Sequence, residues 1–294
     1  MKQSFATARE ETPGKMSGGL KDKTPVIRRA PSPVSSASKV HHAPNESRTQ
    51  RLKLIIAYDG AGFRGWQSQA GGETIQDRIE EAFAGIAGRK VRIHGAGRTD
   101  AGVHAVGQCA HADVPAGKLT PTTWLNALNA SLPATIRIIR CRFVSPNFHA
   151  RFSARGKVYR YHIATGPVLL PFEADRAWHV AVPLDDAAIR ACAEMFIGRH
   201  DFAGFAANRG QMVRSTVRTI RSVRIRRTSS VTVIDFDADG FLYKMVRLMV
   251  GAIVHCGLGK RTLAEVCGQL HAPSSKSVRL VAPAGGLTLV RVHY

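Results

Sequence analysis

The chain has 294 residues and a formal net charge of +21, because 42 Lys and Arg outnumber 21 Asp and Glu. This excess is larger than solubility requires and points to a polyanionic partner, most readily a nucleic acid. The five cysteines include no CxxC pair, which argues against a disulfide framework or a thiolate zinc site, and no apolar run approaches the roughly 18 residues that would span a membrane.

Residues 1–50 differ in composition from the rest of the chain. They hold five of the fourteen prolines, many serines and few large aliphatic residues, so they bury too little apolar surface to offset the entropy of folding. We expect a disordered basic arm here, with a formal charge of +16 left on residues 51–294. The first residues lack the apolar core of a secretory signal, which predicts a cytoplasmic protein.

The hydrophobic pattern of residues 51–294 predicts interleaved strands and helices. The first strand covers 52–58, and Thr74 caps a helix that runs to about Gly88, with Ile75, Ile79, Phe83 and Ile86 as its buried stripe. The later elements, in chain order, are strands at about 91–95 and 107–114, a helix from Thr120 and Pro121, strands at 135–144 and 157–163, a helix at 184–198, strands at 218–227 and 231–238, helices at 241–256 and 263–270, and a strand at 287–293.

Several of these neighbouring strands are spaced as hairpins, and the second half of the pattern repeats the plan of the first. This favours an α+β fold with mainly antiparallel sheets over a doubly wound parallel sheet. We expect two similar α/β halves joined around a central basic cleft. The N-terminal half would be 51–153 and the C-terminal half 154–294.

The segment 95–105 (GAGRTDAGVHA) carries the strongest catalytic signal of the chain. Its glycines allow positive φ and a close approach to a ligand, and catalytic groups commonly sit on such loops. Asp100 lies two residues from Arg98, so its carboxylate could stay ionised and attack carbon or hold a proton. Asp100 could equally cap a turn.

Arg247 lies within an otherwise apolar helical run, FLYKMVRLMV at 241–250. A guanidinium removed from water needs a partner, since its burial otherwise costs several kcal/mol. Asp100 is the acidic group that we expect to face it, and the alternative is an Arg247 side chain that reaches solvent.

Basic and aromatic residues alternate over 148–161 (FHARFSARGKVYRY). Aromatic rings stack on unpaired bases while cations contact phosphates, which suits RNA binding. Ordinary strand composition is the other explanation, because Tyr is common in strands.

At these residues the chain closely resembles the tRNA pseudouridine synthase A family, over nearly all of residues 51–294. The segment Arg98-Thr99-Asp100-Ala101-Gly102-Val103-His104 is highly specific to that family. The matching segments are Tyr58-Asp59-Gly60, Gly65-Trp66-Gln67, 96–104, 126–133, 148–154, Tyr159-Arg160-Tyr161, His200-Asp201-Phe202, Met245-Val246-Arg247 and 286–290.

The resemblance implies an enzyme that isomerises uridine to pseudouridine at positions 38–40 of the tRNA anticodon arm. Asp100 would be the nucleophile, Tyr159 would stack against the target base, and Arg247 would keep Asp100 charged. Arg98 would fill the space that the flipped base leaves. The matching segments also make Gln67, His104, Arg151 and Arg160 candidate substrate-binding residues.

The resemblance further implies that no metal or organic cofactor is needed and that the protein is a homodimer, since one tRNA spans both subunits. Whether Asp100 attacks C1′ or abstracts a sugar proton stays open. Two other functions remain: a non-catalytic RNA-binding protein with two RRM-like halves, and a nucleoside-cleaving hydrolase with two carboxylates.

Overall fold

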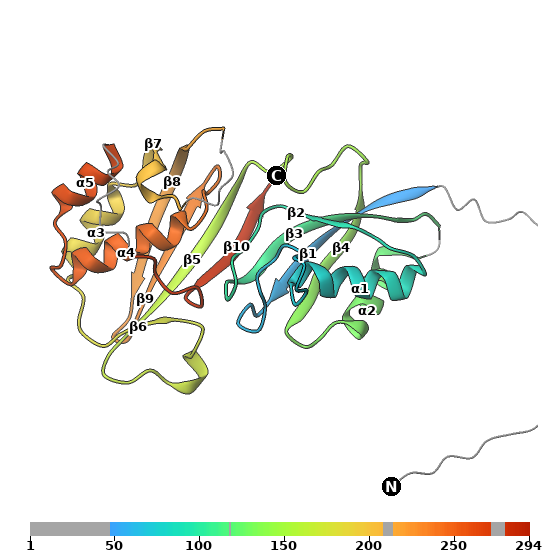
Figure 1. The fold of residues 1–294 in the computed structure, drawn as a ribbon, viewed down its shortest axis with the longest axis horizontal. Helices are drawn as coiled ribbons and strands as arrows, with labels where there is room; N and C mark the ends of the chain where they lie inside the picture. Colours follow the sequence, from blue (N-terminus) through green and yellow to red (C-terminus); the bar gives the residue numbers. More distant parts are fainter. Residues whose placement is uncertain (1–47, 118, 208–213, 272–279) are drawn as a thin grey trace, which may run out of the picture. The chain divides into compact units, whose positions relative to one another are not determined.

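The computed structural model of the chain describes residues 48–117, 119–207, 214–271 and 280–294 (Figure 1). The described residues belong to one compact unit. Most of the predicted N-terminal arm, residues 1–47, lies outside the described residues, and the first strand already begins at Thr49.

The described residues form ten strands, five α-helices and two short 3-10 helices. The strands are β1 (Thr49–Tyr58), β2 (Ile93–Gly95), β3 (His104–Pro115), β4 (Ile136–Val144), β5 (Gly156–Thr165), β6 (Trp178–Val180), β7 (Gly198–Asp201), β8 (Val217–Arg227), β9 (Val231–Ala238) and β10 (Leu287–His293). The helices are α1 (Ile75–Ala87), α2 (Pro121–Ser131), α3 (Asp186–Glu194), α4 (Met245–Gly257) and α5 (Leu263–His271), with 3-10 turns η1 (Pro171–Glu173) and η2 (Phe202–Phe205).

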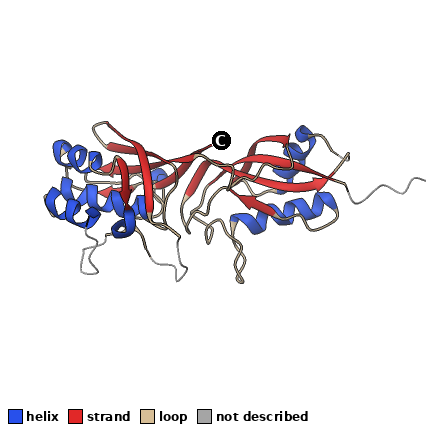
Figure 2. Cartoon of the chain, turned by 90° about the horizontal axis from the view of Figure 1, so that it is seen from above, coloured by secondary structure: helices blue, strands red, loops and turns tan. Residues whose placement is uncertain are grey.

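All ten strands belong to one mixed sheet with the order β4-β1-β3-β10-β5-β9-β8-β7, with β2 on β3 and β6 on β5. Among the described strands the pairs β10–β3 and β5–β6 are parallel, and the other seven are antiparallel. The predicted α+β class with mainly antiparallel pairing is therefore confirmed. Helices α1 and α2 lie beside the strands β1–β4, and α3, α4 and α5 lie toward the β7–β9 end (Figures 1 and 2).

Strand β10 joins the two parts of the sheet: it is the last element in sequence but lies between β3 and β5. It pairs parallel with β3 through Thr288 and Leu289, opposite His104 and Ala105. On its other side it pairs antiparallel with β5. The start of β3, which follows the Asp100 loop, thus lies one strand away from β5.

Local sequence explains most of the elements. In β1, Leu52, Leu54 and Ile56 alternate onto one buried face. The hydroxyl of Thr74 accepts the backbone N–H of Asp77 and caps α1, as predicted. Residues Ile75, Ile79 and Phe83 of the predicted stripe are buried, whereas Ile86 is only partly buried.

Two predicted helices are shorter than expected. The helix predicted at 241–256 begins at Met245, because Lys244 has a left-handed backbone with φ of 58°. The helix predicted at 184–198 begins after the N-cap Asp185 and ends at Glu194. Gly198 then takes φ of 112° and begins β7, a strand that was not predicted. Hydrophobic periodicity carries no information on such residues with positive φ, so it does not locate these helix ends.

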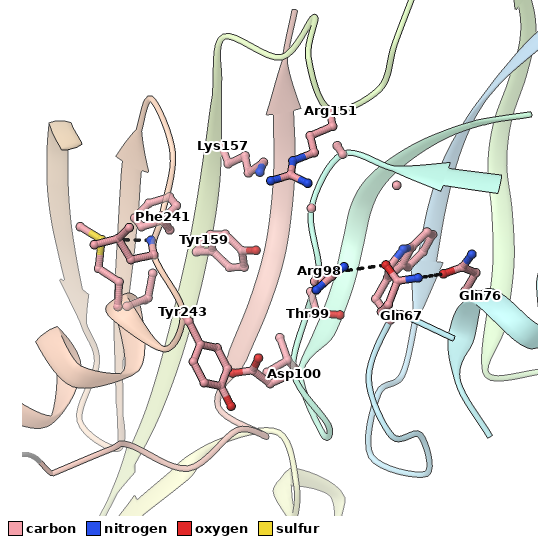
Figure 3. Close-up of a pocket in the computed structure, with 18 of the residues that line it drawn as sticks. Gln67, Gln76, Arg98, Thr99, Asp100, Arg151, Lys157, Tyr159, Phe241 and Tyr243 are labelled. Atoms are coloured by element: carbon pink, nitrogen blue, oxygen red, sulfur yellow. Dashed lines mark hydrogen bonds between the residues drawn. The ribbon is translucent and has the colours of Figure 1, made fainter. Parts of the chain in front are cut away.

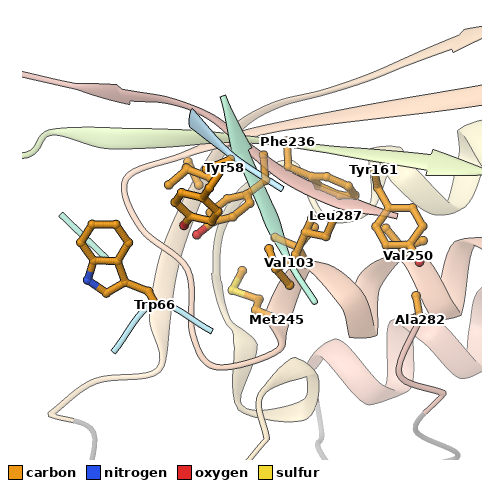
Figure 4. Close-up of a cluster of buried hydrophobic side chains, with 14 of the residues drawn as sticks. Tyr58, Trp66, Val103, Tyr161, Phe236, Met245, Val250, Ala282 and Leu287 are labelled. Atoms are coloured by element: carbon orange, nitrogen blue, oxygen red, sulfur yellow. The ribbon is translucent and has the colours of Figure 1, made fainter. Parts of the chain in front are cut away.

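A continuous hydrophobic cluster supports the sheet where α4 packs on it (Figure 4). It includes Tyr58 at the end of β1, Val103 in the Asp100 loop, Met245 from α4, and Leu287 from β10. Residues from both ends of the described chain thus share one core, which holds the loop and the helix in register.

Candidate active site in a basic pocket

The loop between β2 and β3 carries Asp100, and its backbone is fixed at Thr99. The carbonyl of Thr99 accepts the Trp66 N–H at 3.1 Å, and the buried Thr99 and Tyr58 hydroxyls lie 2.8 Å apart. Gly65 approaches the loop closely: it has φ of 92°, and a Cβ there would lie 2.7 Å from the Thr99 carbonyl oxygen. The adjacent Asp100 is therefore attached to a backbone with little freedom to move.

Arg247, in the first turn of α4, faces this aspartate. Its Nη1 lies 3.4 Å from Oδ2 of Asp100, and the two side chains are only 13% and 17% exposed. Its Nε donates to the Ala282 carbonyl at 2.7 Å. The guanidinium does not reach solvent, whereas the alternative interpretation required that it does. Its hydrogen bond to the Ala282 carbonyl holds it beside the Asp100 carboxylate.

Tyr159 on β5 is 7% exposed and packs edge-on against Phe241, with ring centroids 5.2 Å apart and an interplanar angle of 87°. Burial raises the pKa of Tyr159, and the phenol of Tyr58 and the charge of Asp100 raise it further. The hydroxyl therefore keeps its proton and can donate a hydrogen bond.

These three residues line a common pocket of about 680 Å³ (Figure 3). Such a volume suits a small-molecule site and has room for more than one uracil base. Asp100 is the one carboxylate among the described lining residues, against six basic side chains: Arg92, Arg98, Arg151, Lys157, Lys244 and Arg247. The pocket is thus an anion-attracting cavity with a single ionisable acid inside it.

Arg98 and Gln67 belong to one hydrogen-bonded row at the pocket wall (Figure 3). Arg98 donates to the Gln67 side-chain oxygen at 3.1 Å, and Gln67 donates to the buried Gln76 at 2.7 Å. Gln76 in turn donates to Glu80 at 2.7 Å. This row runs from α1 to the exposed Arg98 guanidinium and orients it at the pocket.

Lys157 lies two residues before Tyr159 on β5 and lines the same pocket. Burial lowers the pKa of Lys157 to about 8, and the positive charges of Arg151 and Arg218 contribute to this shift. The ammonium is therefore charged at neutral pH but loses its proton more easily than an exposed lysine does.

Two predicted substrate-binding residues do not line the pocket. His104 is buried: its Nδ1 accepts the Gly60 N–H at 3.0 Å, and its Nε2 lies 2.8 Å from the Asp175 carbonyl oxygen. Arg160 pairs with Asp235 of β9 at 2.7 Å. Successive side chains of a strand point to opposite faces, so Arg160 cannot share the pocket with its neighbour Tyr159.

The lining residues that were not predicted as site residues include Lys157, Phe241, Tyr243 and His94. Period-two alternation from Tyr159 could have identified Lys157. Phe241 and Tyr243 were assigned to a helix, whereas they belong to the loop that ends at the left-handed Lys244. No local signal marks His94.

Among the described residues, no group of three His, Cys, Asp or Glu side chains is placed to hold a metal ion. The described helices are also too short or too polar to cross a lipid bilayer.

Comparison with known proteins gives the family. Residues 54–153 and 192–294 match the family model described as tRNA pseudouridine synthase. The chain is 48% identical over 252 residues to tRNA pseudouridine synthase A of Akkermansia muciniphila, covering 83% of this chain and 95% of the relative. It is 47% identical over 251 residues to tRNA pseudouridine synthase A of Solidesulfovibrio magneticus, covering 83% and 91%.

Among solved structures, the chain is similar to a chain of an archaeal box H/ACA sRNP Nop10–Cbf5 complex, with a TM-score of 0.37 and 12% identity. The match covers 82% of this chain and about half, 48%, of that one. The sequence matches are much stronger and extend over most of the described residues. By these matches, the chain belongs to the tRNA pseudouridine synthase family, whose members are isomerases that convert uridine to pseudouridine in tRNA.

Proposed function

We propose that this enzyme modifies uridines at positions 38–40 of the tRNA anticodon stem-loop, with Asp100 as its nucleophile. The observation that carries this proposal is the single carboxylate in a pocket with six basic side chains, anchored against the guanidinium of Arg247. The basic residues supply attraction for RNA phosphates. The ion pair holds the carboxylate in one orientation next to the bound base.

The isomerisation needs one bond broken and one bond formed at the same sugar carbon. An Asp100 oxygen attacks C1′ of the ribose while the N1–C1′ bond breaks, and the uracil leaves with the electron pair. The uracil turns, its C5 bonds to C1′, and Asp100 leaves again as a carboxylate. Loss of the C5 proton to solvent and uptake of a proton at N1 complete pseudouridine. If Asp100 instead removes a sugar proton first, the same ionised carboxylate is required.

Tyr159 and Arg98 support the base during this exchange. The buried Tyr159 ring is steadied by Phe241, which suits it to stack on the uracil while its phenol stays protonated. Arg98 is exposed and aimed by Gln67, so it can fill the gap that the extruded base leaves in the RNA stack.

The position of the pocket supports an arrangement of two halves around a basic cleft. Its lining comes from the β2–β3 loop, which belongs to the proposed N-terminal half 51–153, and from β5 and α4, which belong to the proposed C-terminal half 154–294. Gln67 and Arg151 complete the RNA contacts, whereas His104 and Arg160 act in the surrounding scaffold. A homodimer and a cytoplasmic location, without a metal or organic cofactor, complete the proposal.

Asp100→Asn tests the assignment, because it removes the nucleophile and preserves the shape of the side chain. We expect tritium release from tRNA labelled at uridine C5 to fall by at least about 10⁴-fold, while tRNA binding stays within a fewfold of wild type. Activity within tenfold of wild type would contradict the role of Asp100.

The same experiment separates the alternatives. A hydrolase would release free uracil from tRNA, whereas an isomerase leaves the nucleotide in the chain. A non-catalytic RNA-binding protein would release no tritium before the substitution either.

A further inference from the structure

The rim of the pocket carries an exposed aromatic ring for which the proposed chemistry has no use. Phe152 lies in the loop between β4 and β5, is 77% exposed and lines the same pocket as Asp100. An exposed phenylalanine loses apolar stabilisation unless something covers it. Its place at the entrance of a nucleic-acid pocket therefore calls for an explanation.

Phe152 is fixed in place despite its exposure. The imidazole Nδ1 of His149 accepts the backbone N–H groups of Arg151 and Phe152 at 3.1 and 3.3 Å. The Ser153 N–H donates to the His149 carbonyl at 2.9 Å, and the Ser153 hydroxyl accepts the His149 N–H at 3.0 Å. Burial lowers the pKa of His149, which favours the neutral imidazole that these bonds require.

The loop is also anchored to the core beneath it. The Ala150 N–H donates to Nδ1 of the buried His111 at 3.1 Å, and its carbonyl accepts the Tyr294 hydroxyl at 2.7 Å. The loop thus presents a ring whose position is set before any ligand arrives, so little entropy is lost when something stacks on it.

Phe152 is the outermost of four aromatic rings that contact one another in sequence. The Phe152 and His149 centroids lie 4.2 Å apart with an interplanar angle of 31°. His149 lies 4.7 Å from His111, which stacks on His94 at 5.0 Å and 23°. One side of Phe152 is thereby occupied by His149, and the exposure of the ring leaves other surface available.

The charges around this ring identify the ligand. The Arg151 guanidinium carbon lies 5.8 Å from the Phe152 centroid, and Arg92, Arg151 and Lys157 line the same pocket as Phe152. An aromatic platform surrounded by cations suits an unpaired nucleobase with its phosphates. A protein partner would need acidic residues against the same cations.

We propose that Phe152 and His149 form a second base-binding site, on which a nucleotide next to the target uridine stacks. This inference rests on the proposed function. When the target base leaves the RNA stack to reach Asp100, both of its neighbours lose a stacking partner; Arg98 fills the gap, and one of the two neighbours stacks on Phe152. The site would lower the energetic cost of base extrusion and hold the flanking phosphate against Arg151.

The test compares tRNA affinity of the full-length chain with Phe152→Ala, Phe152→Trp and the control Phe172→Ala. Phe172 is 87% exposed and lies outside the pocket, so its removal deletes an equally exposed ring elsewhere. We expect Phe152→Ala to weaken binding by about 5- to 100-fold, the range measured for one stacked base. Phe152→Trp should stay within about threefold of wild type, and Phe172→Ala should equal wild type.

Two further RNAs identify the stacked base, each with an abasic nucleotide on one side of the target uridine. One of them should weaken binding to the wild type and have no further effect on Phe152→Ala, because both changes remove the same contact. Additive losses for both RNAs would overturn the proposal, as would affinity of Phe152→Ala within twofold of wild type.

Sedimentation of the same variants adds a separate outcome. If Phe152→Ala converts a dimer to a monomer, the ring is a subunit contact and the base site is refuted. If the wild type binds tRNA but releases no tritium, the proposed isomerisation fails, whereas the binding comparison still decides the role of Phe152.

Discussion

Replacing Arg247 with methionine tests whether this guanidinium keeps Asp100 ready for reaction. The charges are separated by 3.4 Å, which corresponds to about 5 kcal/mol of attraction at an effective dielectric constant of about 20. Both side chains are mostly buried, so water replaces little of this attraction. Without Arg247, the carboxylate loses the guanidinium that orients it for attack on C1′.

We expect the single-turnover rate of pseudouridine formation to fall by about 10²- to 10³-fold, since part of the 5 kcal/mol is offset by relief of desolvation. Tritium release from uridine-labelled tRNA measures the rate, and filter binding shows whether tRNA is still bound. Arg247→Lys should give an intermediate rate, because one ammonium cannot reach Asp100 and the Ala282 carbonyl in the way that the guanidinium fork does.

Arg227→Met is the matched control. Arg227 likewise joins a backbone carbonyl, that of Leu184 at 3.1 Å, and a carboxylate, that of Asp186 at 3.3 Å, but it lies outside the pocket. Its loss should lower thermal stability modestly and leave the rate within twofold of wild type. A folded Arg247→Met enzyme that reacts within fivefold of wild type would refute the reasoning.

Two further predictions concern the pocket wall and the loop. Burial lowers the pKa of Lys157 to about 8, so the side chain loses its positive charge as the pH rises through this value. The affinity for tRNA should therefore fall about tenfold between about pH 7 and pH 9. A binding titration of Lys157→Met should show no such fall. The lowered pKa also makes the free energy of unfolding rise with pH between about 8 and 10.5, because in this range Lys157 keeps its proton only in the unfolded chain. Gly65→Ala places a Cβ 2.7 Å from the Thr99 carbonyl oxygen, whereas a Cβ at Gly72, also at positive φ, meets nothing within 4 Å. Calorimetry should show a free energy of unfolding lowered by about 2–4 kcal/mol for Gly65→Ala and about 1 kcal/mol for Gly72→Ala, and equal losses would show that crowding against the loop is unimportant.

Much of the local structure follows from neighbouring residues and could be predicted. The alternation of Leu52, Leu54 and Ile56 defines β1, and Thr74 with its apolar stripe defines α1, because strand and helix periods differ and caps act within one turn. The catalytic candidates Asp100 and Arg247 and the substrate-binding candidate Arg98 were likewise proposed from the sequence, since charges on a glycine-rich loop and in an apolar helix stand out from their surroundings.

Local patterns failed where the backbone changes direction without a change in hydrophobicity. The left-handed Lys244 delays the start of α4, so Phe241 and Tyr243 lie in the loop before the helix and line the pocket. Arg160 belongs to the same basic and aromatic pattern as Tyr159, but strand alternation places it on the other face of β5, where it pairs with Asp235.

From composition and motifs alone, the sequence determined a basic α+β protein, one candidate catalytic carboxylate and the family to which the chain belongs. Only the tertiary structure decided which groups meet that carboxylate. The last strand, β10, inserts between β3 and β5, and this brings a loop near residue 100, a strand near residue 159 and a helix near residue 247 around one pocket. Pairing between strands so far apart in the sequence depends on the burial and hydrogen bonding of the whole sheet. A short stretch of sequence therefore does not predict it.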